Sequence, residues 1–412
     1  MTKKLFNQIK NEWHSNLWLM AELLLVSVVM WFIVDYLYVQ YSVYNQPRGF
    51  DTNHCYHIAM GTLSQGDTDY NPSDTVHMDD VEELMARLRR RPEIDAVSLS
   101  FISFPYNTSN TWQPVTCGNF KAENIFTRYV TPDFFRVFKI EGVRGESPEQ
   151  LSKMLKEKVF MVTDDLYKDK YHLNMTSMIG KKFVLGGDSA NKSTLIAAYK
   201  PMRYSDYMEA SVSRSYIAFL PKKNYTPDLE LCVRVKEGQD VDFSEKLWKD
   251  ADKQLSVGNV YISNVESFSD IRKSFQQDDT NQTRNCIFGM GFLMLNIFLG
   301  LLGTFWFRTQ QRRSELALFK ALGATKGDVF VRQIMEGLLL LLIATIPAIL
   351  IDANIAFAGL NQKMDGVTLA PGRFIITVVI TWLLIAIMIV LGNWLPAKKA
   401  MSIQPARALH EE

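Results

Sequence analysis

Long runs of apolar residues interrupt an otherwise polar chain at four places. The runs cover residues 17–39, 286–307, 334–351 and 374–395. Each has roughly 20 residues, which is enough to cross a ~30 Å hydrocarbon layer as a helix. We therefore predict four transmembrane helices, arranged as one plus three along the chain. Their predicted bounds are residues 17–41, 284–308, 328–351 and 374–395.

The first run resembles a secretory signal peptide because Lys3, Lys4 and Lys10 precede it. Its apolar stretch is too long for the hydrophobic region of such a peptide, and no small-residue cleavage site follows it. We therefore interpret it as an uncleaved membrane anchor.

The basic residues of the short segments predict the orientation. They gather in three segments, which are residues 1–16, 309–325 and 396–412. Basic segments stay on the cytoplasmic side, so both termini and the loop between the second and third helices are predicted to be cytoplasmic. Residues 45–282 and the loop at 352–373 then lie outside the cytoplasm.

The large segment between the first two runs has the pattern of an α+β domain. Apolar residues at Val81, Leu84, Met85 and Leu88 follow helical spacing. Ser147 and Gln150 have the spacing of a capping box that opens another helix. Residues 229–235 alternate between apolar and polar side chains, as a strand with two different faces does.

This extracytoplasmic domain is predicted to have two subdomains. Strand–helix–strand patterns occur at both ends of residues 45–282. We expect residues 45–102 and 223–266 to form one subdomain, with residues 103–222 inserted into it.

Composition excludes some classes of function. The 412 residues carry a net charge of +1, so we expect no nucleic acid among the partners. Four cysteines in 412 residues exclude the class of small proteins that are dense in disulfides. Mean hydropathy is −0.05, but this value averages lipid-compatible runs with a polar remainder.

One segment resembles a phosphate-binding loop. Residues 186–193 read GGDSANKS, with Lys192 and Ser193 correctly placed after Gly186. Asn191 replaces the second glycine of the motif, and a strand-like run follows where the motif needs a helix. A hairpin loop is the better interpretation.

His54, Cys55 and His57 cluster just beyond the first helix. No second cluster completes a tetrahedral set, so we interpret them as ordinary strand residues and expect no metal site. Cys55 and Cys117 both lie on the oxidising side, and sequence alone leaves a disulfide between them open.

Three acidic residues fall within or beside the predicted spans, which makes them functional candidates by default. They are Glu22, Asp35 and Glu336. For Glu22 and Asp35 we favour side chains that reach the nearby interface with water. The chain shows no nucleophile–base signature, so we expect no enzyme activity.

The basic loop between the second and third runs predicts a short amphipathic helix. Leu316, Phe319 and Lys320 recur at helical spacing from Arg312. Gly323 suits the C-terminal end of this helix, and Asp328 suits the start of the next one. Such a helix either anchors passively at the membrane surface or receives the motion of a partner.

This loop carries a family resemblance. Residues 313–325, RSELALFKALGAT, with Glu336 further on, closely resemble the signature of FtsX-like ABC transporter permeases. The tail at 396–409 resembles the end of the MacB-like branch, and Thr131-Pro132-Asp133-Phe134-Phe135 resembles its periplasmic core domain. The chain differs from MacB in lacking a fused ATPase domain, so we expect a stand-alone permease subunit.

The resemblance implies mechanotransmission in the bacterial inner membrane. A separate ABC ATPase, which holds ATP and Mg²⁺, would bind the coupling helix. The residues implied in this contact are Arg312, Arg313, Glu315 and Lys320, with Leu316 and Phe319 filling a groove and Gly323 ending the helix. Glu336 would be a structural or coupling residue within the lipid, and the chain itself would bind no cofactor.

The resemblance also implies a second permease, identical or paralogous, and a periplasmic membrane-fusion protein or enzyme as a further partner. Export or extraction of a substrate is the first hypothesis for function. The alternatives are an ATPase-coupled regulator of a periplasmic enzyme, and an extracytoplasmic sensor without any ATPase.

Overall fold

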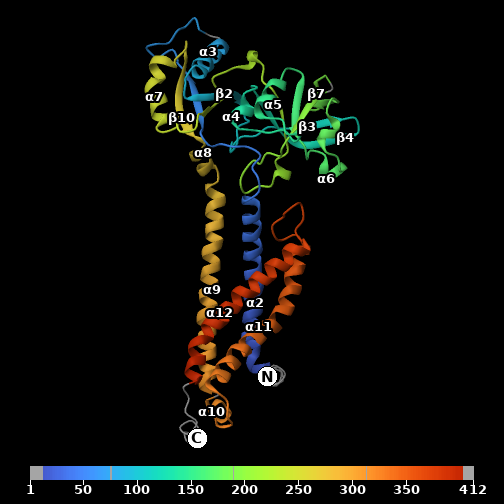
Figure 1. The fold of residues 1–412 in the computed structure, drawn as a ribbon, viewed down its shortest axis with the longest axis vertical. Coiled ribbons are helices and arrows are strands. Elements are labelled where there is room, and N and C mark those ends of the chain that lie inside the picture. The colour runs from blue at the N-terminus through green and yellow to red at the C-terminus, as the bar shows by residue number, and fades with distance from the viewer. Residues whose placement is uncertain (1–12, 75–76, 189, 312, 402–412) are drawn as a thin grey trace. The chain divides into compact units, whose positions relative to one another are not determined.

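The computed structural model describes residues 13–74, 77–188, 190–311 and 313–401 (Figure 1). The chain forms two compact units, which we describe separately. The membrane unit comprises Met1–Ser42 and Thr280–Glu412, and the sheet domain comprises Val43–Asp279.

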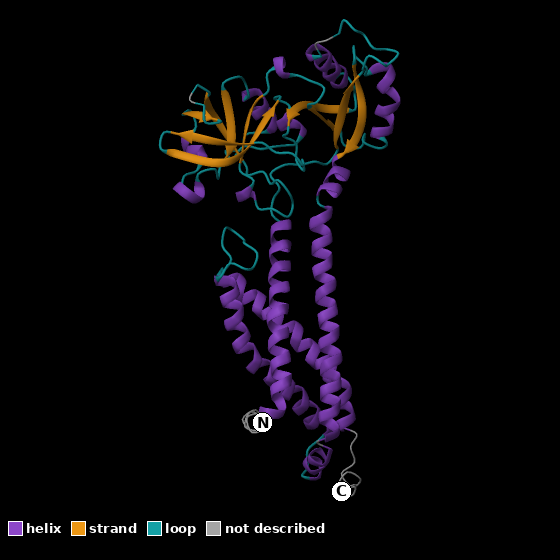
Figure 2. Cartoon of the chain, turned by 180° about the vertical axis from the view of Figure 1, so that it is seen from behind, coloured by secondary structure: helices purple, strands orange, loops and turns teal. Residues whose placement is uncertain are grey.

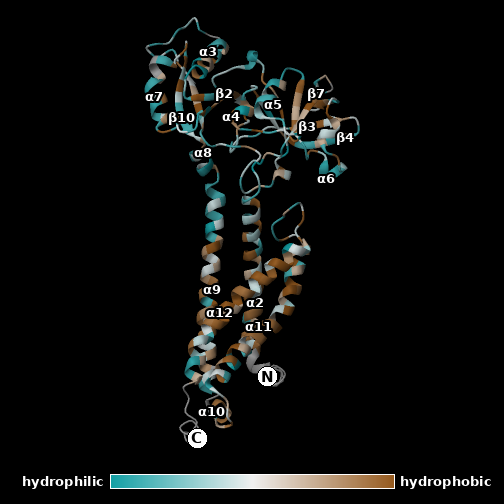
Figure 3. Ribbon diagram, in the orientation of Figure 1, coloured by the Kyte–Doolittle hydropathy of each residue, from teal (hydrophilic) through white to brown (hydrophobic). Residues whose placement is uncertain are grey.

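The described residues of the membrane unit include four helices that are long and apolar enough to cross a membrane. They are α2 (Trp13–Tyr44), α9 (Gln277–Gln311), α11 (Lys326–Phe357) and α12 (Pro371–Met401). Their apolar stretches form a brown band in Figure 3, whereas the sheet domain is mixed in colour. A short helix, α10 (Arg313–Ala321), lies between α9 and α11 in the chain. The four helices extend beyond the predicted apolar runs because polar turns continue them at their ends.

The four long helices share one apolar core. It contains Leu23 and Met30 of α2, Leu301 of α9, Leu340 of α11 and Ile389 of α12. Small residues permit close approach within this core. A Cβ atom added at Gly337 of α11 would lie 2.7 Å from Cγ2 of Ile389 and 2.9 Å from Cζ of Phe305 in α9.

The sheet domain is an α+β structure (Figure 2). Its described residues form ten strands: β1 (Cys55–Thr62), β2 (Ile94–Phe101), β3 (Trp112–Cys117), β4 (Phe120–Val130), β5 (Val159–Thr163), β6 (Lys182–Leu185), β7 (Lys192–Tyr199), β8 (Ser215–Phe219), β9 (Glu230–Val235) and β10 (Val260–Ser267). The α-helices are α3 (Met78–Arg89), α4 (Phe134–Val137), α5 (Pro148–Met154), α6 (Lys168–Tyr171), α7 (Phe243–Gln254) and α8 (Phe268–Phe275).

Strands from the two ends of this domain pair with one another in the order β10-β1-β9-β2. Helices α3 and α7 cover one face of these strands, where Leu84 and Leu247 pack with Leu231 and Val233 of β9. The other face of β9 places Cys232 against a second core around α4 and α5. The predicted alternation of residues 229–235 is therefore confirmed.

The remaining strands form a closed sheet. Their order is β4-β3-β6-β7-β5-β8, and β8 pairs back onto β4 in parallel. Apolar side chains such as Phe160, Phe183 and Tyr216 fill the interior. The sequence pattern did not indicate β3 and β4, which supply two walls of this closed sheet.

Two predicted helices are confirmed in detail. Helix α3 buries Val81, Leu84, Met85 and Leu88, the four residues of the predicted apolar stripe. Helix α5 begins with a complete capping box, in which Ser147 accepts from the Gln150 backbone and the Gln150 side chain accepts from the Ser147 backbone. Both elements depend on residues close in sequence, which is why their pattern was sufficient.

Candidate functional site

Helix α10 occupies the position predicted for the coupling helix, and its C-terminal end has the predicted form. Gly323 has a φ of +101°, a backbone conformation that favours glycine. The Ala324 N–H donates to the Phe319 carbonyl at 3.2 Å, and the Gly323 N–H donates to the Lys320 carbonyl at 3.0 Å. These two bonds form a Schellman motif, which ends the helix sharply.

The next helix begins almost at once. Thr325 caps α11 by accepting from the Asp328 backbone, while the Asp328 carboxylate accepts from the Thr325 backbone N–H at 2.9 Å. This capping box satisfies two donors that would otherwise lack partners. Helices α10 and α11 are therefore separated by a short, well-defined turn.

One face of α10 packs inside the membrane unit. Leu316 is only 5% exposed and forms a small apolar cluster with Val329 of α11 and Ala400 of α12, with Phe319 against it. The Lys320 ammonium donates to the Met401 carbonyl at 2.8 Å. Helix α10 is therefore attached to both α11 and α12.

A cation–π contact adds to this attachment. The Arg332 guanidinium of α11 lies 4.7 Å from the centre of the Phe319 ring. Such contacts contribute about 0.5–1 kcal/mol at exposed sites. Phe319 is half-buried, so part of its ring contacts other residues of this chain.

The opposite face of α10 exposes apolar side chains. Leu318 is 52% exposed and Leu322, which follows the last residue of the helix, is 79% exposed. Their i, i+4 spacing places them on one side. The sequence-based prediction gave the groove-filling role to Leu316 and Phe319, whereas the structure buries Leu316, half-buries Phe319 and leaves Leu318 and Leu322 accessible. Spacing alone did not show which apolar residues face inward.

Three predicted contact residues have no described side chain. Arg312 lies outside the described residues. Arg313 and Glu315 belong to α10, but the placement of their side chains is outside the described part of the structure. Their roles stay predictions.

Glu336 is half-buried in α11, directly before Gly337. A neighbouring polar network joins three helices at this level. Gln333 of α11 bonds to Thr309 of α9 at 3.1 Å, and Asn393 of α12 donates to the Gln333 carbonyl at 2.8 Å. The structure thus places Glu336 beside a junction of α9, α11 and α12.

Asp35 does not reach toward an interface, so our interpretation of this residue was wrong. Its carboxylate accepts a hydrogen bond from Nε of Arg373 at 2.8 Å and another from Asn361 at 2.9 Å. The Asp35 and Arg373 side chains are 2% and 4% exposed. Pairing replaces the water that each charge loses on burial.

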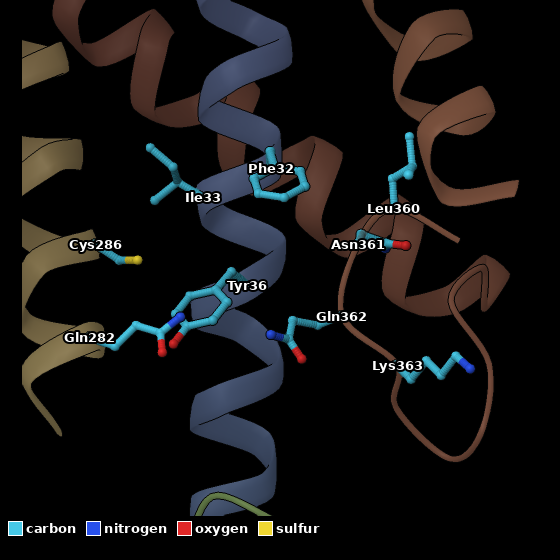
Figure 4. A pocket seen from close by; sticks show the side chains of 9 residues that line it. All are labelled: Phe32, Ile33, Tyr36, Gln282, Cys286, Leu360, Asn361, Gln362 and Lys363. Carbon is cyan, nitrogen blue, oxygen red and sulfur yellow. The ribbon is translucent and has the colours of Figure 1, made fainter. Parts of the chain in front are cut away.

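A cavity of about 560 Å³ lies between α2, α9 and the segment after α11 (Figure 4). Phe32, Ile33 and Tyr36 of α2 face it from one side. Gln282 and Cys286 of α9 line another side, and residues 360–363 close a third. Among these lining residues, apolar and amide groups predominate, and they form no nucleophile–base arrangement.

The open question of a disulfide is answered in the sheet domain. Cys55 and Cys117 are both free thiols. Cys55 lies in β1 and its thiol contacts the Val137 carbonyl at 3.1 Å, within the core around α4 and α5. Cys117 lies in β3, against the interior of the closed sheet. The two thiols therefore belong to different cores.

The histidines near Cys55 also take separate positions. His54 bonds to Asp240 at 2.8 Å. His57 packs against the Phe104 ring, and burial lowers its pKa to about 4. Burial raises the pKa of the Cys55 thiol to about 12. The loop at residues 186–193 joins β6 to β7 as a hairpin, as expected, and a strand follows it.

Residues 287–405 match the family FtsX-like permease C-terminal. This part of the membrane unit is therefore similar to the FtsX-like permease C-terminal family. The matched residues include most of α9 and the helices α10, α11 and α12, together with the cluster that holds α10.

Two solved structures are similar to parts of the chain. The periplasmic region of MacB from Actinobacillus actinomycetemcomitans is 11% identical, with a TM-score of 0.31, and covers 57% of this chain and 98% of that one. A domain of a putative permease protein from Porphyromonas gingivalis is 12% identical, with a TM-score of 0.32, and covers 53% and 90%. None of the curated proteins matches the chain.

Proposed function

We propose that this chain is the transmembrane subunit of an ABC transporter and is driven by a separate ATPase. The FtsX-like domain supports a permease subunit in general terms. The observation that carries the proposal is the two-sided arrangement of α10. One face is attached to α11 and α12 through Leu316 and Lys320, and the other exposes Leu318 and Leu322.

This arrangement allows α10 to transmit a displacement from a bound partner to the membrane helices. A partner that binds Leu318 and Leu322 gains by burying their apolar surface, at about 25 cal/mol per Å². Because Leu316 and Lys320 join α10 to two membrane helices, a displacement of α10 would be passed to both. ATP-driven closure of the partner would supply that displacement. ATP and Mg²⁺ belong to the partner, and this chain contributes no catalytic group.

The remaining parts of the proposal concern orientation and assembly. Helix α10 would face the cytoplasm at the bacterial inner membrane, since basic residues gather in its loop. Arg312, Arg313 and Glu315 would add charged contacts with the ATPase. A second permease, and a membrane-fusion protein that contacts the periplasmic sheet domain, would complete a machine that exports or extracts a substrate.

Co-purification tests the proposal directly. Tagged full-length protein from native membranes should bring down an ABC ATPase. The double substitution Leu318→Asp with Leu322→Asp should abolish this association while leaving the permease folded. Leu360→Asp is the matched control, because Leu360 is also an exposed leucine, 68% accessible, but lies after α11. Circular dichroism checks the fold of each variant.

Two results would contradict the proposal. Wild-type protein that never brings down an ATPase would exclude a transporter subunit. Equal recovery of the ATPase with the double variant and with Leu360→Asp would exclude the role of the exposed face of α10. Charge reversal at Arg313 or Glu315 then tests the flanking contacts, and the expected result is ATP hydrolysis that no longer responds to the permease.

A further inference from the structure

Three side chains with metal-binding atoms converge at the start of α3, in the sheet domain. Asp74 precedes the helix, His77 is its N-cap residue, and Asp80 lies in its first turn. Nδ1 of His77 lies 3.9 Å from Oδ2 of Asp74 and 3.7 Å from Oδ2 of Asp80. One ligand atom from each residue lies within 4.8 Å of the other two.

These separations are too long for hydrogen bonds, which need about 2.7–3.2 Å between nitrogen and oxygen. Nδ1 of His77 and Oδ2 of Asp80 are both inaccessible to solvent, and neither has a hydrogen-bond partner among the described residues. Buried polar atoms in proteins are nearly always satisfied. Two such atoms that face one another therefore point to a bound group between them.

The two carboxylates are also crowded against the same backbone atom. A Cβ atom at Gly258 would lie 2.3 Å from Oδ2 of Asp74 and 2.9 Å from Oδ2 of Asp80. Among the ion pairs of the described residues, neither carboxylate pairs with lysine or arginine. A cation between the carboxylates would relieve their repulsion.

Helix capping accounts for only part of this geometry. The Asn259 N–H donates to Oδ2 of Asp74 at 2.7 Å, and the Asn259 amide donates to the Asp74 carbonyl at 3.0 Å. These bonds fix Asp74, as outer partners fix metal ligands. They leave Nδ1 of His77 and Oδ2 of Asp80 unexplained.

We propose that Asp74, His77 and Asp80 bind a divalent transition-metal ion of the zinc type. Ligand atoms at ~2.0–2.2 Å from a tetrahedral ion lie roughly 3.3–3.6 Å apart, so the observed separations need to shorten by only a few tenths of an ångström. Imidazole selects zinc over calcium or magnesium, which prefer all-oxygen sites. Water fills the fourth position. The site departs from the sequence-based expectation of no metal.

Such an ion would join Asp74 to the first turn of α3. Asn259, which precedes β10 and donates to Asp74, would link this site to a segment that is remote in sequence. The unfolded chain contains no preformed site, so binding would stabilise the folded domain.

Zinc titration of the full chain in detergent, after removal of metal with a chelator, tests the site. Calorimetry should find one ion bound per chain, with affinity reduced about tenfold or more in His77→Gln and in Asp80→Asn. His54→Gln is the matched control, since His54 also pairs with one aspartate but has no third ligand, and it should bind as the wild type does. Cobalt in place of zinc should give the visible absorption of a tetrahedral site, and His77→Gln should lose it.

The alternative is an imidazolium that pairs with the two carboxylates and binds no metal. Wild-type protein that binds no zinc, or His77→Gln that binds it as tightly as His54→Gln does, would overturn the proposal. Tight binding of magnesium or calcium without zinc would also overturn it. Circular dichroism of each metal-free variant separates loss of the site from loss of the fold.

Discussion

Nε of Arg373 in α12 donates a hydrogen bond to Oδ1 of Asp35 in α2 at 2.8 Å. Almost no solvent reaches either side chain. The guanidinium also donates to the Gln362 carbonyl at 2.8 Å, so the pair ties the segment before α12 to α2. The pair holds together parts of the membrane unit that are 338 residues apart in the chain.

Removing one member of this pair should destabilise the membrane unit strongly. Asp35→Asn leaves the Arg373 charge buried without its counter-ion, which typically costs about 3–5 kcal/mol. We expect a clear fall in the thermal unfolding temperature of the detergent-solubilised protein. Glu123→Gln is the control, because the exposed pair of Glu123 with Lys121 should contribute nothing measurable. Equal unfolding temperatures for the two variants would contradict this role for Asp35.

The attachment of α10 should depend on its buried leucine and not on its exposed one. Leu316→Ala removes the centre of the cluster with Val329 and Ala400, and the cost should be about 2 kcal/mol or more. The amides of α10 should then exchange hydrogen faster, since exchange reports local opening. Leu318→Ala, on the exposed face, should leave exchange unchanged. Equal protection in the two variants would show that the cluster does not hold α10.

The pH dependence of the sheet domain should contain a contribution from His57. Burial lowers the pKa of His57 to about 4, from an ordinary value of 6.5. Between these values the unfolded chain binds a proton that the folded chain does not, so stability falls as the pH falls through this window. The full effect is about 3 kcal/mol.

His57→Phe should flatten that dependence. Urea unfolding of the full chain at pH 7 and at pH 4.5 provides the comparison. The carboxyl groups that also titrate in this range are the same in both proteins, so their contribution cancels. The wild type should lose more stability than the variant on acidification. The same loss in both proteins would contradict burial of an uncharged His57.

Local features of this chain were predictable and long-range ones were not. The α3 stripe, the Ser147 capping box and the Gly323 helix end each depend on residues a few positions apart. Strand β3 was missed because Pro114 interrupts its pattern, at a point where the pairing with β4 shifts register. Its place in the sheet is set by pairing with β4 and β6, which a periodicity search does not detect.

The candidate site shows the same limit. Sequence located α10 and its end, but the burial of Leu316 depends on Ala400, which lies far along the chain. Likewise, Asp35 is an isolated acid in the sequence, and only the fold brings Arg373 to it. The spacing of Asp74, His77 and Asp80 gave no recognised signal, because Gly258 completes their environment.

The close packing around Gly337 leaves no room for a side chain, so substitutions at this position should destabilise the membrane unit. In Gly337→Ala the new methyl group would meet Ile389 and Phe305 at under 3 Å, so α9 and α12 must shift away from α11. Overpacking of this kind costs about 1–3 kcal/mol. Alanine also favours helix over glycine by about 1 kcal/mol, and that gain acts in the opposite direction.

Gly303→Ala separates the two effects. Gly303 also lies within a long helix, but a Cβ atom there meets nothing within 4 Å. Gly303→Ala should raise the thermal unfolding temperature in detergent or leave it unchanged, whereas Gly337→Ala should lower it. Because Gly337 follows Glu336 and lies among the residues that match the FtsX-like family, the same substitution should also weaken any response of the membrane helices to α10. A Gly337→Ala protein as stable as Gly303→Ala would show that α9, α11 and α12 are not packed as closely as described.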